Sequence, residues 1–165
     1  MDRFYLYAKN IMKKINNKNF KKTLSKFMTG VTVICVEKNK KIFGKTVNSF
    51  SSLSLNPPLI LFALGIKSSS LNVFLESNYL TVNILSNKKK KISEIFSKNE
   101  PDINKIEFNK INRNSYISNC LANLEVKLID KIKKGDHIIF ICKVMKVNHN
   151  DKLKPLSYYN SKYIK

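Results

Sequence analysis

Apolar residues stand in short, β-branched blocks from residue 31 onwards, which predicts a chain folded mainly into β-strands. Val31–Val36 is such a block and is typical of a buried strand. Leu124–Leu128 alternates apolar with charged residues, as expected of a half-buried strand. Six strands are predicted, over residues 31–36, 42–48, 59–64, 79–85, 124–128 and 138–147, with residues 155–159 as a candidate edge strand.

Helical spacing is confined to three segments. Residues 1–28 have one apolar and one lysine-rich face, which favours a helix packed on its own domain over a helix on a membrane surface. The apolar face begins with Phe4, Tyr7, Ile11 and Ile15. The Asn-rich run 16–19 could break this helix in two. Shorter helices are predicted after Ser68–Ser70 and after Asn87.

Consecutive strands joined by hairpin turns predict an antiparallel barrel with peripheral helices. The 165 residues fit one domain with its own core, and there is no internal repeat or linker. We expect this domain to span residues 23–165, behind an N-terminal helical extension over residues 1–22. The Ser-rich segment 49–56 is predicted to be irregular, and residues 97–119 to be a loop with short elements.

The composition is strongly basic, since 31 Lys and Arg residues against 11 Asp and Glu give a formal net charge of +20. Such a charge is typical of nucleic-acid partners. Only Arg3 and Arg113 are arginines, however, and base-reading sites favour the arginine fork. The lysine excess fits codon drift in an AT-rich genome better than a selected basic surface, so no specific nucleic-acid partner is predicted.

Neither a metal site nor a membrane segment is indicated. Cys35, Cys120 and Cys142 are far apart and form no C-x-x-C pair, so we expect buried, reduced thiols in a cytoplasmic protein. The longest apolar run, residues 59–64, is far shorter than the ~20 residues of a membrane helix. The N-terminus has no apolar core typical of a secretory signal.

Two polar segments are candidate ligand sites. Gly44–Ser54 offers hydroxyl, amide and loop N–H groups to an anionic or heteroaromatic ligand, although a solvated loop held by local serine bonds explains the same pattern. Lys67–Ser70 precedes a predicted helix, where an anion is favoured; an ordinary serine cap is the alternative. His137 opens a strand and is either structural or functional. No glycine-rich nucleotide-binding motif is present.

In order and spacing, these segments resemble the flavin reductase-like family of FMN-binding split barrels, which are NAD(P)H:flavin oxidoreductases of two-component monooxygenases. The strongest block is residues 44–58, GKTVNSFSSLSLNPP, and the resemblance runs from about Phe20 to Tyr163. The supporting blocks are residues 24–34, 67–71, 82–85, 121–125 and 135–137.

The resemblance implies a mainly β protein, an antiparallel FMN-binding split β-barrel of about six strands with short helices, assembled as a homodimer. It implies FMN or FAD as cofactor and NADH or NADPH as co-substrate. The residues that it implies for flavin are Thr46, Val47, Asn48, Ser49, Phe50, Ser52 and Asn83, with the phosphate on Ser52, Lys67, Ser68 and Ser70. His137 would lie near the nicotinamide.

By the same resemblance, the protein is expected to transfer hydride from nicotinamide C4 to flavin N5 and to release reduced flavin to a partner oxygenase. A flavin- or heme-binding split barrel without this activity and a nucleic-acid-binding protein are the alternatives. Two departures concern the nicotinamide side and the dimer edge. The family's C-terminal Tyr-x-Arg-Gly-Arg-Tyr is YYNSKY at residues 158–163, and its Gly-x-Pro is missing around residues 113–117.

Overall fold

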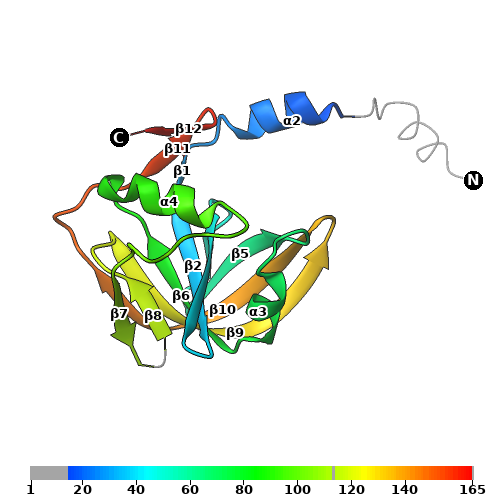
Figure 1. Cartoon of the computed structure of the whole chain (residues 1–165). Helices are drawn as coiled ribbons and strands as arrows, with labels where there is room; N and C mark the ends of the chain where they lie inside the picture. The colour runs from blue at the N-terminus through cyan, green and yellow to red at the C-terminus, as the bar shows by residue number, and fades with distance from the viewer. Residues whose placement is uncertain (1–14, 113, 165) are drawn as a thin grey trace, which may run out of the picture.

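A seven-stranded antiparallel sheet forms the body of the protein and curls until β3 and β5 touch (Figure 1). The computed structural model describes residues 15–112 and 114–164, and every structural statement below refers to these residues. The strand order is β3-β2-β6-β9-β10-β5-β4. The bounds are β2 (Thr32–Lys38), β3 (Lys41–Val47), β4 (Ser51–Ser54), β5 (Leu59–Gly65), β6 (Tyr79–Ile84), β9 (Ala122–Lys134) and β10 (His137–His149). The predicted mainly β, antiparallel fold is confirmed.

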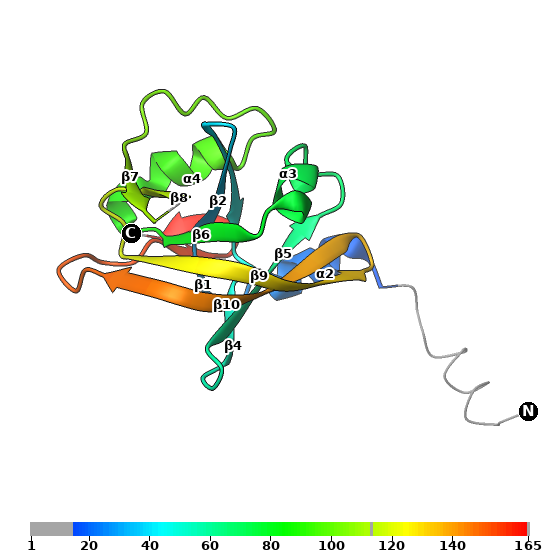
Figure 2. The same cartoon turned by 90° about the horizontal axis from the view of Figure 1, so that it is seen from below.

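Two tight turns set the register of the sheet. Asn39 and Lys40 both have positive φ and join β2 to β3 in a two-residue hairpin, a geometry that asparagine tolerates well. Gly135, with a φ of 57°, and Asp136 join β9 to β10 in the same way, so that His137 is the first residue of β10. The long β9–β10 ribbon runs across the molecule in Figure 2.

Two apolar clusters lie on opposite faces of β2. Inside the curled sheet, the rings of Phe62 and Phe140 stack with their centroids 4.9 Å apart. Outside it, helix α4 (Lys90–Phe96), entered through the 3-10 turn η1 (Asn87–Lys89), buries Phe96 in the second cluster. Because β2 is buried on both faces, its apolar run is continuous. Helix α3 (Leu71–Glu76) contributes Leu71 and Phe74 to the first cluster.

The three cysteines are buried and free, as predicted. Burial raises the pKa of the Cys120 thiol to about 11 and that of Cys142 to about 12, and it raises the pKa of Cys35 further. No group of His, Cys, Asp and Glu side chains in the described part of the chain could hold a metal ion. No described helix is long and apolar enough to cross a membrane.

The candidate edge strand over residues 155–159 is confirmed by β11 (Ser157–Tyr159) and the short elements within 97–119 are present, whereas β1 (Thr29–Gly30), β4 and β12 (Lys162–Ile164) were not predicted. The segment 49–56 is not wholly irregular, because β4 within it pairs with β5 through a bulge. The segment 97–119 holds a hairpin of β7 (Phe108–Ile111) and β8 (Asn114–Ile117). A third sheet joins β1, β11 and β12. Asn160 and Ser161 form its turn with positive φ, where the resembled motif has Arg-Gly.

Helix α2 (Asn17–Leu24) stands away from the barrel (Figure 1). It begins inside the Asn-rich run, where the Asn16 side chain caps it by accepting hydrogen bonds from the N–H groups of Lys18 and Asn19. The expectation that this helix packs on its own domain is wrong for α2, since none of its residues is buried. The predicted apolar positions 4, 7 and 11 lie outside the described residues.

Candidate functional site

Ser49 joins the end of β3 to β5. Its hydroxyl donates a hydrogen bond to the carbonyl oxygen of Ala63 and accepts one from the N–H of the same residue, both at 3.0 Å. A single side chain thereby replaces the pair of backbone bonds that a longer β3 would have made. The backbone of residues 46–49 is therefore held beside β5.

A cleft of about 220 Å³, which we call the His137 cleft, opens next to this contact. It brings together the end of β3, the end of β5 with its following turn, and the start of β10. Its lining residues are Lys45, Thr46, Val47, Asn48, Ser49, Ala63, Leu64, Gly65, Ser68 and His137. The sheet register explains this meeting of distant segments, because His137 pairs with Gly65 across β10 and β5.

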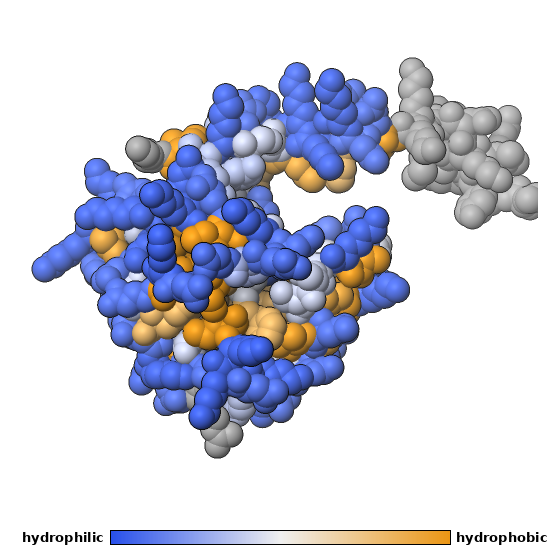
Figure 3. Space-filling view, viewed as in Figure 1, coloured by the Kyte–Doolittle hydropathy of each residue, from blue (hydrophilic) through white to orange (hydrophobic). Residues whose placement is uncertain are grey.

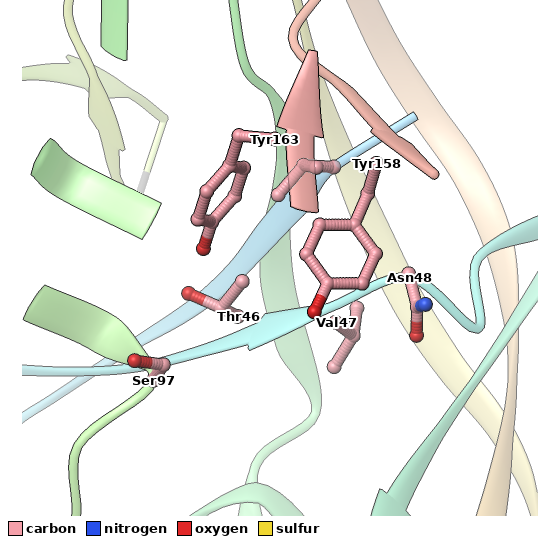
Figure 4. A pocket seen from close by; sticks show the side chains of 7 residues that line it. Thr46, Val47, Asn48, Ser97, Tyr158 and Tyr163 are labelled. Carbon is pink, nitrogen blue, oxygen red and sulfur yellow. The ribbon is translucent and has the colours of Figure 1, made fainter. Parts of the chain in front are cut away.

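A second cleft, of about 310 Å³, is also lined by residues 46–48, and we call it the tyrosine cleft (Figure 4). Tyr158 and Tyr163 reach into it from the C-terminal hairpin with their rings edge to face, the centroids 5.3 Å apart. The Tyr163 hydroxyl is 2.9 Å from Ser93 Oγ of α4, which fixes the ring. The lining residues are Val31, Thr46, Val47, Asn48, Ser97, Tyr158 and Tyr163.

Thr46, Val47 and Asn48 line both clefts, and each residue contributes differently. The Thr46 hydroxyl donates to the carbonyl oxygen of Ser93 at 2.7 Å and so ties β3 to α4. Val47 is buried in the inner cluster, whereas Asn48 is exposed. A ligand in either cleft therefore contacts a segment that Thr46 and Val47 hold in place and whose last residue, Asn48, offers an exposed amide.

His137 is held by its neighbour Asp136. Its Nδ1 atom lies 2.7 Å from Asp136 Oδ1, and the carboxylate therefore accepts a hydrogen bond from Nδ1–H. This contact lowers the pKa of the Asp136 carboxyl. The other ring nitrogen, Nε2, faces the backbone of Gly65, because an added Cβ there would lie 3.8 Å from it. The half-exposed ring thus keeps Nε2 at the cleft.

The Lys67–Ser70 segment divides between the cleft and its surroundings. Ser68 lines the His137 cleft, and its hydroxyl is buried without a hydrogen-bond partner. Ser70 is buried directly before α3, and its side chain makes no capping bond. Lys67 is exposed and lines neither cleft; it lies near Asp136, whose pKa it lowers further. The predicted helix start is confirmed, since α3 begins at Leu71.

Besides Lys67 and Ser70, three more residues that the resemblance implied for flavin line neither cleft. Ser52 is exposed on β4, and Phe50 is half-buried against the inner cluster. Asn83 is fully buried in β6, where its amide donates to the carbonyl of Val33 at 2.9 Å. Its Oδ1 accepts from the N–H of Ile117 and from Asn123 Nδ2, both at 2.8 Å. The Asn83 amide is thus committed to holding the sheet and the β8 hairpin together.

The structure adds cleft residues that the sequence analysis did not include. Lys45, Ala63, Leu64 and Gly65 line the His137 cleft, and Tyr158, Tyr163, Val31 and Ser97 line the tyrosine cleft. Lys45 could have been found from the strongest block, where it directly precedes Thr46. The tyrosines belong to the C-terminal motif, but only the fold shows that this hairpin pairs with β1 beside β3. None of the residues lining either cleft is acidic.

The model of the flavin reductase like domain family matches residues 24–165. The FMN reductase (NADH) SmoA of Agrobacterium fabrum is 32% identical over 138 residues, 82% of this chain and 79% of that protein. The reductase subunit HsaB of a flavin-dependent monooxygenase of Mycobacterium tuberculosis is 31% identical over 153 residues, 90% of this chain and 82% of that protein.

The fold agrees with these similarities. The solved structure of the flavin reductase PheA2 superimposes with a TM-score of 0.85 at 32% identity and covers 91% of this chain and 97% of that chain. The family model matches residues 24–165, and these include the strands that build the His137 cleft and the C-terminal hairpin that builds the tyrosine cleft. The chain belongs to the flavin reductase like domain family.

Proposed function

We propose that the protein is an NAD(P)H-dependent flavin reductase that binds flavin and nicotinamide along residues 46–49 and supplies reduced flavin to a partner monooxygenase. The observation that carries the proposal is that Thr46–Asn48 form the wall shared by the two clefts. These residues belong to the sequence block that most resembles the family. Two planar ligands that must meet need adjoining clefts, and reacting atoms come within about 3–3.5 Å.

The residues present fit a flavin. A flat ring system is favoured beside fixed backbone and aromatic walls, which Ser49 and the tyrosine pair supply. A buried hydroxyl without a partner at Ser68 and the absence of acidic lining residues favour the anionic part of a nucleotide. When bound, flavin supplies the redox chemistry by accepting a hydride at N5 from nicotinamide C4.

In this proposal His137 positions the nicotinamide rather than moving a proton. Asp136 holds Nδ1, so Nε2 can bond a polar group of an incoming ligand from a fixed direction. Hydride transfer between two rings requires stacking and alignment, and no protein acid or base need act on either ring. This agrees with the His137 cleft, in which Lys45 and His137 are the ionisable side chains among the described lining residues.

The active form is proposed to be a homodimer, in which a second copy completes the clefts. The tyrosine cleft is at the lower end of the range of about 300–1,000 Å³ typical of small-molecule sites, and the His137 cleft is below it. Large apolar side chains remain exposed on α2 and the segment after it, at Phe20, Leu24, Phe27 and Met28. In Figure 3 the apolar side of α2 faces the barrel across open space, which a second copy could fill.

Steady-state oxidation of NADH and NADPH, measured with and without added FMN or FAD, tests the function. We expect oxidation that rises with flavin concentration for at least one nucleotide. Flavin binding without any oxidation would support the alternative, a split-barrel protein that binds flavin but is no reductase. If the protein bound neither FMN nor FAD, the proposed function would be wrong. The partner oxygenase and the cytoplasmic location stay predictions.

A further inference from the structure

Strand β3 has a free edge, because it is the first strand of the seven-stranded sheet and, among the described strands, only β2 pairs with it. In an antiparallel pair, successive residues direct their backbone N–H and C=O groups alternately towards and away from the partner strand. The two-residue turn of Asn39 and Lys40 makes Lys41 the first residue of β3 that bonds β2. The backbone groups of Ile42 and Gly44 therefore point away from β2.

The pairing on the other side of β2 agrees with this assignment. The N–H of Leu85 donates to the carbonyl oxygen of Val31, so the odd-numbered residues of β2 bond β6 and the even-numbered ones bond β3. Among the described residues, no loop, turn or inter-element backbone hydrogen bond includes Ile42 or Gly44. Gly44 is buried, and buried backbone groups are nearly always paired, so this edge calls for a hydrogen-bonding partner.

Two adjoining cavities follow this edge, and we call them together the β3-edge groove. Ile42 and Phe43 line both of them. The cavity of about 420 Å³ lies at the β2–β3 turn, and the cavity of about 290 Å³ continues to Gly44. Ile103 and Phe108, which pack against the second cluster, give the groove an apolar wall. The free backbone groups thus lie along a groove that is larger than either cleft of the candidate site.

The β3-edge groove has a basic end and an apolar middle. Lys40 and Lys41 line it at the turn and are exposed, and none of the ion pairs between described residues includes them. Glu100 lines the other end, in the smaller cavity. A segment bound here therefore meets unpaired ammonium groups at one end only, and it meets Ile42 and Phe43 between the two ends.

We propose that the β3-edge groove binds an extended segment of an acidic partner protein, which adds to β3 as an antiparallel strand. Ile42 and Gly44 each exchange two backbone hydrogen bonds with one residue of this segment. The net charge of +20 favours the approach of an acidic partner. A second copy of this chain is disfavoured, because pairing two β3 strands through these residues opposes Lys41 with Lys45, and like charges directly opposite are destabilising.

The antiparallel direction also orders the sequence of the segment. Its C-terminal end lies at Lys40 and Lys41, so its acidic residues follow its apolar residues. The residues opposite Ile42 and Gly44 are the apolar ones, because Ile42 packs against the second cluster. The inference does not depend on the proposed reductase activity, since the groove lies outside both clefts of that site.

Amide hydrogen exchange followed by NMR tests the inference on the full-length protein. The probes are acetylated and amidated seven-residue peptides with Val, Ile or Phe at the third and fifth positions, Glu at the last two positions and Thr elsewhere. Without peptide, we expect the amide of Ile42 to exchange about tenfold or more faster than that of Phe43, which β2 holds. The peptides should slow exchange at Ile42 and Gly44. Peptides with Lys in place of Glu, or with methylated nitrogens at the apolar positions, should not.

Lys40→Glu combined with Lys41→Glu should weaken the acidic peptides by about tenfold or more, because two attractive charge pairs become repulsive. Lys152→Glu combined with Lys154→Glu is the matched control. It changes the net charge by the same amount at two exposed lysines that line neither the groove nor the clefts. We expect this control to bind the peptides as wild type does.

The inference is overturned if none of the acidic peptides slows exchange at Ile42 and Gly44. It is also overturned if both pairs of substitutions weaken binding equally, because the attraction is then one of overall charge and not of the groove. Slow exchange of Ile42 without peptide would show that the edge is already covered. If that protection rises with protein concentration, a second copy is the occupant; if it does not, the chain itself covers the edge, and either result contradicts the proposal.

Discussion

At the scale of single residues, His137 tests the division between flavin binding and nicotinamide positioning. Because Asp136 occupies Nδ1, replacing His137 by Ala removes one oriented hydrogen-bonding group from the cleft and leaves residues 46–49 in place. We expect KM for the nicotinamide nucleotide to rise, or turnover to fall, by about two- to tenfold, the value of one neutral hydrogen bond. The dissociation constant of flavin should stay within twofold, roughly, because no flavin contact is lost.

His149→Ala is the control for this variant. His149 ends the same strand, is exposed, and lies near Asp151, with its Nε2 atom 3.7 Å from the carboxylate. It lines neither cleft, so we expect both kinetic constants to match wild type. If His137→Ala weakens flavin as strongly as nicotinamide, the ring of His137 belongs to the flavin site and the division is wrong.

The sequence predicted which segment lines the clefts better than it predicted what each polar residue does there. Thr46–Ser49 were predicted from a dense polar block, and they do line the clefts, because a polar run between apolar strands must lie where a strand ends. Asn83 looked equally polar, but its amide is used entirely within the sheet. The sequence alone does not show which of Lys45 and Lys67 lines the His137 cleft. Only the strand direction and the turn after β5 decide which lysine reaches the cleft.

At the scale of elements, Gly44 controls how closely β3 packs on α4. A Cβ built at this position would lie far inside van der Waals distance of the ring of Phe96, which is fully buried. We therefore expect Gly44→Ala to lower the free energy of unfolding by about 1–3 kcal/mol, the usual cost of overpacking. Chemical denaturation of the two proteins measures this difference.

Gly30→Ala provides the matched control, because nothing lies within 4 Å of a Cβ at Gly30 and its φ is ordinary. Its unfolding free energy should stay within about 0.5 kcal/mol of wild type. A Gly44→Ala protein as stable as this control would show that α4 can shift away from β3. The attachment of Thr46 to the carbonyl of Ser93 would then be loose as well.

The long strands were predictable and the short ones were not. β2, β5 and β10 carry apolar runs or hairpin turns that define them locally. β4 consists of serines and one leucine and is a strand only because β5 offers it a free edge. The packing of α2 failed for a related reason: amphipathic spacing shows that a helix has an apolar face, and not which molecule covers that face.

At the scale of the whole molecule, the exposed apolar face of α2 predicts a dimer. We expect light scattering at micromolar concentration to give twice the 19.1 kDa mass of one chain. Leu24→Asp combined with Phe27→Asp should lower that mass towards one chain, because two charges in an apolar interface are costly. Lys22→Asp changes the charge of the polar side of the helix and should stay dimeric. A wild-type mass of 19.1 kDa alone would contradict the dimer.

The most direct test of the central claim is anaerobic mixing of the flavin-loaded protein with NADH and, separately, NADPH, while the visible absorbance of flavin is followed. The two clefts share residues 46–48, so a bound flavin and an incoming nicotinamide should meet there. We predict bleaching of flavin at a rate that saturates with at least one nucleotide and that falls in His137→Ala. Tight flavin binding with no bleaching by either nucleotide would contradict the account and leave a flavin-binding protein without reductase activity.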